Sequence, residues 1–207
     1  MATYKHISGK RIHFIHIPRT GGRFIDKNLL VNDFKQEHST QGTIEGSDVI
    51  HLHRELYEKH LDVKGIPHIA IIRNPIDRFI SSSIFLKRMY GDIQEAMEDP
   101  IMFSTMIQNF PLPDEYTTPS WLRPQSDFLT EDTHVWKFED GFYEDFDVWM
   151  SDILKIPFKT KNVEYKKLET DETDKLKRTD KLVDNIRQFC MKDIKTFYPE
   201  LIRHKRF

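Results

Sequence analysis

The sequence predicts an α/β fold in which helices cover both faces of a parallel β-sheet. Two mainly apolar runs, residues 11–17 and 68–72, each stop at a turn that contains proline, and a helical pattern follows each turn. Runs of this kind are typical of parallel strands that are buried on both faces. Strands that alternate with helices in this way imply right-handed crossovers between parallel neighbours.

The other elements of the first half follow in order. A helix is expected over residues 24–31, directly after the first strand and its loop. Residues 48–52 are a second candidate strand, and a charged helix is expected over 55–61. After residues 68–72, a helix begins near Asn74 and Pro75. Its apolar residues recur at helical spacing, at Ile76, Phe79, Ile80 and Ile84.

The pattern changes after residue 100. A helix is expected over residues 101–110, irregular structure over the proline-rich 111–119, and a last strand over 133–138. Five apolar residues indicate an amphipathic helix: Phe142, Phe146, Trp149, Met150 and Ile153. The charge run 169–181 is interpreted as a solvated loop or helix face. Residues 186–197 are expected to form a C-terminal helix.

The composition fits one domain that spans residues 1–207. The net charge of -2 argues against a nucleic-acid partner. Cys190 is the single cysteine, so no disulfide can form within the chain. The N-terminus lacks a secretory pattern, and no run reaches the ~20 apolar residues that span a bilayer. A reducing, cytoplasmic compartment is therefore expected.

The loop after the first strand has the composition of an anion site. Gly21 and Gly22 allow a phosphate to approach the backbone N–H groups at the start of the following helix. Arg19 and Arg23 add positive charge and forked donors. The alternative is an ordinary strand-to-helix turn with Thr20 as the helix cap. The loop does not match G-x-x-x-x-G-K-[ST], which disfavours an ordinary ATPase or GTPase.

A second basic position, Arg73, directly follows the buried run 68–72, and Ser81 lies in the helix after it. The carboxyl end of a central parallel strand is where open α/β sheets bind ligands. Arg73 and Ser81 are therefore candidates to bind a phosphate. The alternative is that Arg73 and Arg78 form surface ion pairs with carboxylates such as Asp77 and Asp92.

Two histidines, His51 and His53, lie at the end of the second candidate strand. Residues two apart in a strand share a face, so both imidazoles can point into one cleft. An imidazole accepts a proton near neutral pH, which suits a general base. The alternatives are a structural pair or a metal site, although no third or fourth zinc ligand lies at a suitable spacing. Glu55, near the same strand end, is an alternative base.

Four segments, in order along the chain, resemble the sulfotransferases that use 3′-phosphoadenosine 5′-phosphosulfate (PAPS), in particular the carbohydrate branch. FIHIPRTGGRFI, residues 14–25, resembles the family's 5′-phosphosulfate loop. IAIIRNPIDRFISSSIFLKR, residues 69–88, is similar to the 3′-phosphate motif R-[DN]-P-x-x-R-x-x-S. Residues 121–140 and 189–198 resemble the two later segments of the family, with Cys190 where tyrosine is usual.

This resemblance implies a P-loop NTPase-like fold that binds PAPS across the first and third strands. The residues that would hold the 5′-phosphosulfate are Arg19, Thr20, Gly21, Gly22, Arg23 and Phe24. Arg73 and Ser81 would hold the 3′-phosphate, which distinguishes PAPS from ATP. Arg19 stands where the family has lysine, and Arg23 stands where it has a hydroxyl residue, so these two contacts depart from the family pattern.

The activity that the resemblance implies is transfer of a sulfuryl group from PAPS to a hydroxyl of a saccharide or glycolipid, without a metal. His53 would be the general base, His51 would orient the acceptor, and Arg19 would stabilise charge on the bridging oxygen of the leaving phosphate. Two other functions stay open: a P-loop nucleotide kinase or phosphotransferase, and a non-catalytic nucleotide-binding module. The lack of an anchor and of disulfides departs from the Golgi members and suggests a prokaryotic or viral cytoplasmic enzyme.

Overall fold

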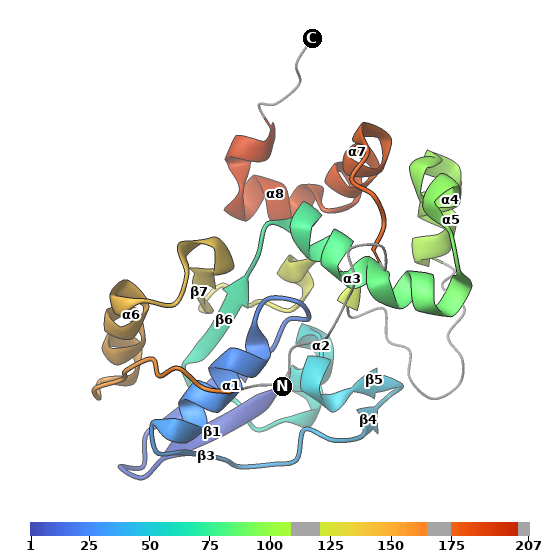
Figure 1. The fold of residues 1–207 in the computed structure, drawn as a ribbon. Helices are drawn as coiled ribbons and strands as arrows, with labels where there is room; N and C mark the ends of the chain where they lie inside the picture. The colour runs from blue at the N-terminus through green and yellow to red at the C-terminus, as the bar shows by residue number, and fades with distance from the viewer. Residues whose placement is uncertain (109–120, 165–174, 203–207) are drawn as a thin grey trace.

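The computed structural model describes residues 1–108, 121–164 and 175–202, and Figure 1 shows their arrangement. Its centre is a five-stranded sheet with the strand order β3-β1-β2-β6-β7. The strands are β1 (Ala2–His6), β2 (Arg11–Ile15), β3 (Phe34–Gln36), β6 (His68–Ile72) and β7 (His134–Lys137). β2, β6 and β7 run parallel, whereas β1 is antiparallel to both of its neighbours.

The α/β class is confirmed, but the prediction of a wholly parallel sheet is wrong. β1 forms an antiparallel hairpin with β2, and β3 pairs with the other edge of β1. The turn between β1 and β2 is tight, because Gly9 adopts a left-handed φ of 87° and its N–H donates to the carbonyl of His6. β1 also carries Thr3 and Lys5, so it lacks the apolar run that marks β2 and β6.

Helices cover both faces of the sheet, as predicted. Ile69 and Ile71 lie in one core with apolar residues of α1 and α6. Ala70 and Ile72 point the other way and lie in a second core with α2. The three helices are α1 (Gly22–Val31), α2 (Arg54–His60) and α6 (Glu144–Leu154). β6 is therefore buried from both sides, which explains its continuous apolar sequence.

A third apolar core lies beyond the carboxyl end of β6, where the remaining helices gather (Figure 1). The helices that contribute to this core are α3 (Pro75–Tyr90), α4 (Gln94–Glu98), α5 (Pro100–Gln108) and α7 (Asp180–Phe189). α8 (Met191–Phe197) follows α7 and packs Phe197 against the second core. Asn74 caps α3, because its side-chain oxygen accepts hydrogen bonds from the N–H groups of Ile76 and Asp77. This cap ties the start of α3 to the end of β6.

Residues 48–52 do not form a strand of the central sheet, so this prediction is wrong. Asp48 ends a separate two-stranded sheet, which consists of β4 (Thr43–Ile44) and β5 (Ser47–Asp48). Residues Val49–His51 form a 3-10 helix. Glu45 and Gly46 join β4 to β5 with φ values of 48° and 74°. A two-residue hairpin loop of type I′ requires such left-handed conformations at both positions.

The other predicted elements are confirmed with small differences. α5 replaces the helix expected over residues 101–110, and β7 and α6 lie where a strand and an amphipathic helix were predicted. The C-terminal helix is divided at Cys190 into α7 and α8. Residues 111–119 lie outside the described residues, as do residues 169–174 of the charge run 169–181. In its described part, Leu176 is buried in the third core.

Buried histidines make the fold sensitive to acid. The ring of His13 is fully buried and lies 5.2 Å from the ring of Tyr57 and 5.0 Å from that of His68, between centroids. Burial lowers the pKa of His13 to about 2, and it also places the pKa of His51 well below its usual value. Both imidazoles therefore stay uncharged in the folded protein at mildly acidic pH.

We expect the free energy of unfolding to fall as the pH drops below about 6.5. Below this pH the unfolded chain takes up protons on these histidines, whereas the folded chain does not. Each histidine therefore lowers the free energy of unfolding by about 1.4 kcal/mol for each pH unit. Urea unfolding at several pH values measures this slope. His13→Gln should reduce the slope, and an unchanged slope in this variant would contradict the explanation.

Candidate anion-binding site

The loop between β2 and α1 is fixed by its two glycines. Gly21 precedes α1 with a φ of 88°, a left-handed conformation that glycine adopts without strain. A Cβ on Gly22 would lie 1.9 Å from Nε2 of His16, so a larger residue there would have to displace the His16 ring. Thr20 does not cap α1, because its hydroxyl donates to the carbonyl of Ile17 at 2.8 Å and Gly21 is the N-cap residue.

The N-terminus of α1 is favourable to an anion. The first N–H groups of a helix have no acceptor within the helix and carry partial positive charge. The first turn of α1 contains no acidic residue, and Arg23 lies in it. The order of strand, glycine loop and helix is therefore as predicted, and anion binding at this loop stays a prediction.

Arg73 lies at the carboxyl end of β6, beside this loop. Its backbone N–H donates to Oε1 of Gln125, and its carbonyl accepts from Nε2 of the same side chain, both at 2.8 Å. Its guanidinium donates from Nη1 to the carbonyl of Arg19 at 3.3 Å and lies over the ring of Phe138, 4.9 Å from the centroid. The side chain of Arg73 therefore spans from the strand end to the loop.

Arg19 and Ser81 are in direct contact. Nε of Arg19 donates to Oγ of Ser81 at 2.9 Å, although 62 positions separate them in the chain. Burial lowers the pKa of Arg19, and the positive charges of Arg73 and Arg23 lower it further. Within the described residues, neither Arg19 nor Arg73 forms an ion pair with a carboxylate. This cluster of cations is therefore suited to bind an external anion.

Arg78 does not form the surface ion pair that was considered for it. The residue is 2% exposed, and its guanidinium donates to the carbonyls of Pro18, Trp121 and Arg123. Asp77, the proposed partner, instead pairs with Arg178 at 2.6 Å. Arg78 thus fixes the start of the anion loop to the segment that begins at Trp121.

Three carboxylate and amide residues that the sequence did not single out hold the strand end in place. Asp193 of α8 accepts hydrogen bonds from the backbone N–H groups of Gln125 and Ser126. Gln125 in turn holds the backbone of Arg73 on both sides. Glu139 accepts from the backbone N–H of Asn74 at 2.6 Å. The sequence signal was present, because Gln125, Glu139 and Asp193 lie in the two later segments of the family resemblance.

An aromatic pocket of about 610 Å³ opens beside Arg73. Its lining residues are Phe24, Arg73, Asp77, Phe138, Glu139, Gly141, Phe142 and Tyr143. The ring of Phe142 lies 5.1 Å from that of Phe24 and 5.9 Å from that of Phe138, between centroids. Flat apolar walls next to a guanidinium suit a planar ring that is attached to a charged group.

His51 and His53 do not share a strand face, contrary to the prediction. His51 ends the 3-10 helix, and its Nδ1 lies 2.9 Å from the carbonyl oxygen of His16. The rings of His51 and His16 meet edge to face at 4.8 Å, and His16 packs against Gly22. His51 therefore lies beneath the anion loop and supports it.

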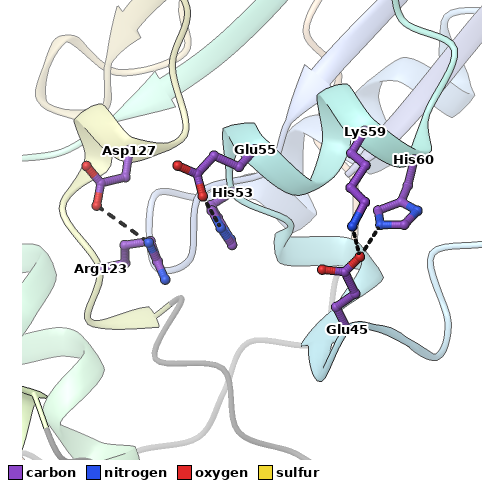
Figure 2. Close-up of polar contacts among 7 residues, drawn as sticks. All are labelled: Glu45, His53, Glu55, Lys59, His60, Arg123 and Asp127. Atoms are coloured by element: carbon purple, nitrogen blue, oxygen red, sulfur yellow. Dashed lines mark hydrogen bonds and ion pairs between the residues drawn. The ribbon is translucent and has the colours of Figure 1, made fainter.

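His53 instead precedes α2 and lies near the segment of Arg123, as Figure 2 shows. Its Nε2 is 3.7 Å from Oε2 of Glu55, and its side chain is 14% exposed. Burial lowers the pKa of His53, and so does the charge of Arg123, while Glu55 and Asp127 act in the opposite direction. His53 is therefore uncharged near neutral pH and able to accept a proton.

Figure 2 also shows a surface cluster that is distinct from this site. Lys59 and His60 of α2 both bind Glu45, the turn residue of the β4–β5 hairpin. These contacts attach the hairpin to α2. They explain why His60, although it is near His53 in sequence, is not a candidate for the base.

Comparison with protein-family models, with curated proteins and with solved structures finds no match to this chain. Over residues 1–108, 121–164 and 175–202, no group of three or more histidine, cysteine, aspartate or glutamate side chains is arranged to hold a metal. In the same residues, none of the helices is long and apolar enough to cross a membrane.

Proposed function

We propose that this protein is a PAPS-dependent sulfotransferase with a P-loop-type nucleotide site, acting on a hydroxyl of a saccharide or glycolipid. One observation carries the proposal: the two segments that resemble the family's phosphate motifs meet in space. Arg19 of the loop contacts Ser81 of α3, and Arg73 contacts the backbone of Arg19. Two phosphate-binding segments on neighbouring parallel strands suit a ligand with two separate phosphates.

We propose one orientation for the donor in this site. The 5′-phosphosulfate lies at the N-terminus of α1, where the loop from Arg19 to Phe24 supplies N–H groups and charge. The 3′-phosphate lies between Arg73 and Ser81. The adenine ring enters the aromatic pocket next to Arg73 and lies against Phe24 and Phe138. Each part of PAPS thus meets a part of the site with matching chemistry.

The reaction is an in-line displacement at sulfur. The acceptor oxygen forms a bond to sulfur while the bond from sulfur to the bridging phosphate oxygen breaks, which leaves adenosine 3′,5′-bisphosphate (PAP). His53 takes the proton of the acceptor hydroxyl. The cations and N–H groups of the loop stabilise the negative charge on the leaving phosphate. His51, half-buried beneath the loop, supports the loop through His16.

PAP should bind without a metal and more tightly than either 5′-AMP or ATP. The reason is that Arg73 and Ser81 contact a 3′-phosphate, which the other two nucleotides lack. Isothermal titration calorimetry in the presence of a chelator measures all three affinities. Equal affinity for PAP and 5′-AMP would contradict the proposal. Tighter binding of ATP that depends on Mg²⁺ would favour a nucleotide kinase instead.

A further inference from the structure

The side chain of Arg19 leaves its own loop and packs on α3. Its Nε donates to Ser81 at 2.9 Å, and its guanidinium lies over the ring of Phe85, 5.8 Å from the centroid. Ser81 and Phe85 are four residues apart in α3, so they lie on one side of that helix. The guanidinium is thereby held next to the hydroxyl that the proposed function gives to the 3′-phosphate.

An arginine can serve two acceptors at this place, whereas a lysine cannot do so in the same way. The guanidinium has five N–H donors in a planar fork. When Nε meets Ser81, the Nη donors of the same plane can meet an oxygen bound beside Ser81. A lysine ammonium is a compact point charge without this fork. Arg19 can therefore contact Ser81 and a bound oxygen at the same time, which a lysine at this position could not do in the same way.

The charge at this place also matches a phosphate monoester. Such a group carries about −1.5 to −2 charges near pH 7. Arg73 and Arg19 are joined by a hydrogen bond to the Arg19 carbonyl, and within the described residues neither pairs with a carboxylate. The two positive charges of these guanidinium groups would be neutralised by one phosphate dianion.

We propose that Arg19 completes the 3′-phosphate subsite together with Arg73 and Ser81, and so makes this chain select donors that carry a 3′-phosphate. The inference rests on the proposed function, and it gives Arg19 a position other than the bridging oxygen of the leaving phosphate. Arg19 is in this view a specificity-determining residue.

The test compares PAP with 5′-AMP, which differs only in lacking the 3′-phosphate, on the wild type and on Arg19→Lys. We expect Arg19→Lys to weaken PAP binding about 30-fold and 5′-AMP binding less than about threefold, the loss of one forked, charge-assisted contact. The preference for PAP then falls by at least about tenfold. The matched control is Arg23→Lys, the same change in the same loop, which should leave this preference unchanged.

A second variant gives an independent measurement. Ser81→Ala should also reduce the preference for PAP, and the double variant with Arg19→Lys should lose less than the product of the single losses, because both changes remove one shared contact. An unchanged preference in Arg19→Lys overturns the inference, and a lower transfer rate at saturating donor would then place Arg19 at the bridging oxygen. A wild type that does not prefer PAP would contradict the proposed function itself.

Discussion

Replacing Arg73 with alanine should weaken PAP binding by about 2–4 kcal/mol, or roughly 30- to 1000-fold. The guanidinium lies at the end of β6, beside the loop and over Phe138, where a phosphate would receive a charge-assisted, forked contact. In the variant this phosphate would lose that contact. Calorimetric titration of PAP into the variant measures the loss directly.

The fold of this variant should be retained, because Gln125 holds Arg73 by its backbone N–H and carbonyl and not by its side chain. The matched control is Arg11→Ala at the opposite end of β2, where Arg11 pairs with Glu37 on the surface. PAP affinity should stay unchanged in the control. Normal PAP binding in Arg73→Ala would show that the anion site lies elsewhere.

The elements that are predicted well from the sequence are those whose buried residues form a regular apolar pattern. β6 is buried on both faces, so it appears as an apolar run, and α6 buries one side, so it appears as a helical repeat. β1 and β3 lack such runs, since β1 contains Thr3 and Lys5 and β3 has three residues. β1 pairs with β2, and β3 pairs with β1, through contacts between separate segments that the local sequence pattern does not reveal.

The residues of the candidate site were also predicted well only where the local sequence order determines their position. Arg19, Arg73 and Ser81 follow directly from the strand-loop-helix order, because the ends of β2 and β6 are adjacent in a parallel sheet. The histidine pair was placed wrongly, because the prediction assumed a strand over residues 48–52. The part played by Arg78 could not be predicted, since its three carbonyl acceptors lie on segments far from it in the chain.

His51 and His53 differ in how accessible their side chains are to an acceptor. The ring of His51 packs against that of His16, which contacts Gly22 of the anion loop, and Nδ1 of His51 already lies 2.9 Å from the His16 carbonyl oxygen. His53 is partly exposed and lies near Arg123, whose backbone Arg78 fixes relative to the loop. Of these two histidines, we therefore expect His53 to contact the hydroxyl acceptor in the proposed reaction.

His53→Ala should lower the rate of sulfuryl transfer about 10²–10⁴-fold, the usual contribution of a positioned acid–base group. PAP affinity and thermal stability should change little, because the side chain neither caps α2 nor lies in an apolar core. Measurements of kcat, PAP affinity and melting temperature on the same preparation separate these effects. His60→Ala, at the end of the same helix, is the matched control and should keep its transfer rate.

The dependence of the transfer rate on pH identifies the base independently. A histidine base works when it is uncharged, so the rate should rise with pH through the pKa of His53. Because burial and Arg123 lower this pKa, the rise should lie below pH ~6.5. Glu55→Gln removes a charge that raises this pKa and should move the rise to lower pH, whereas Arg123→Gln should move it to higher pH. If Glu55→Gln abolishes transfer while His53→Ala keeps it, Glu55 is the base, and if neither variant changes transfer to any hydroxyl acceptor, both assignments fail.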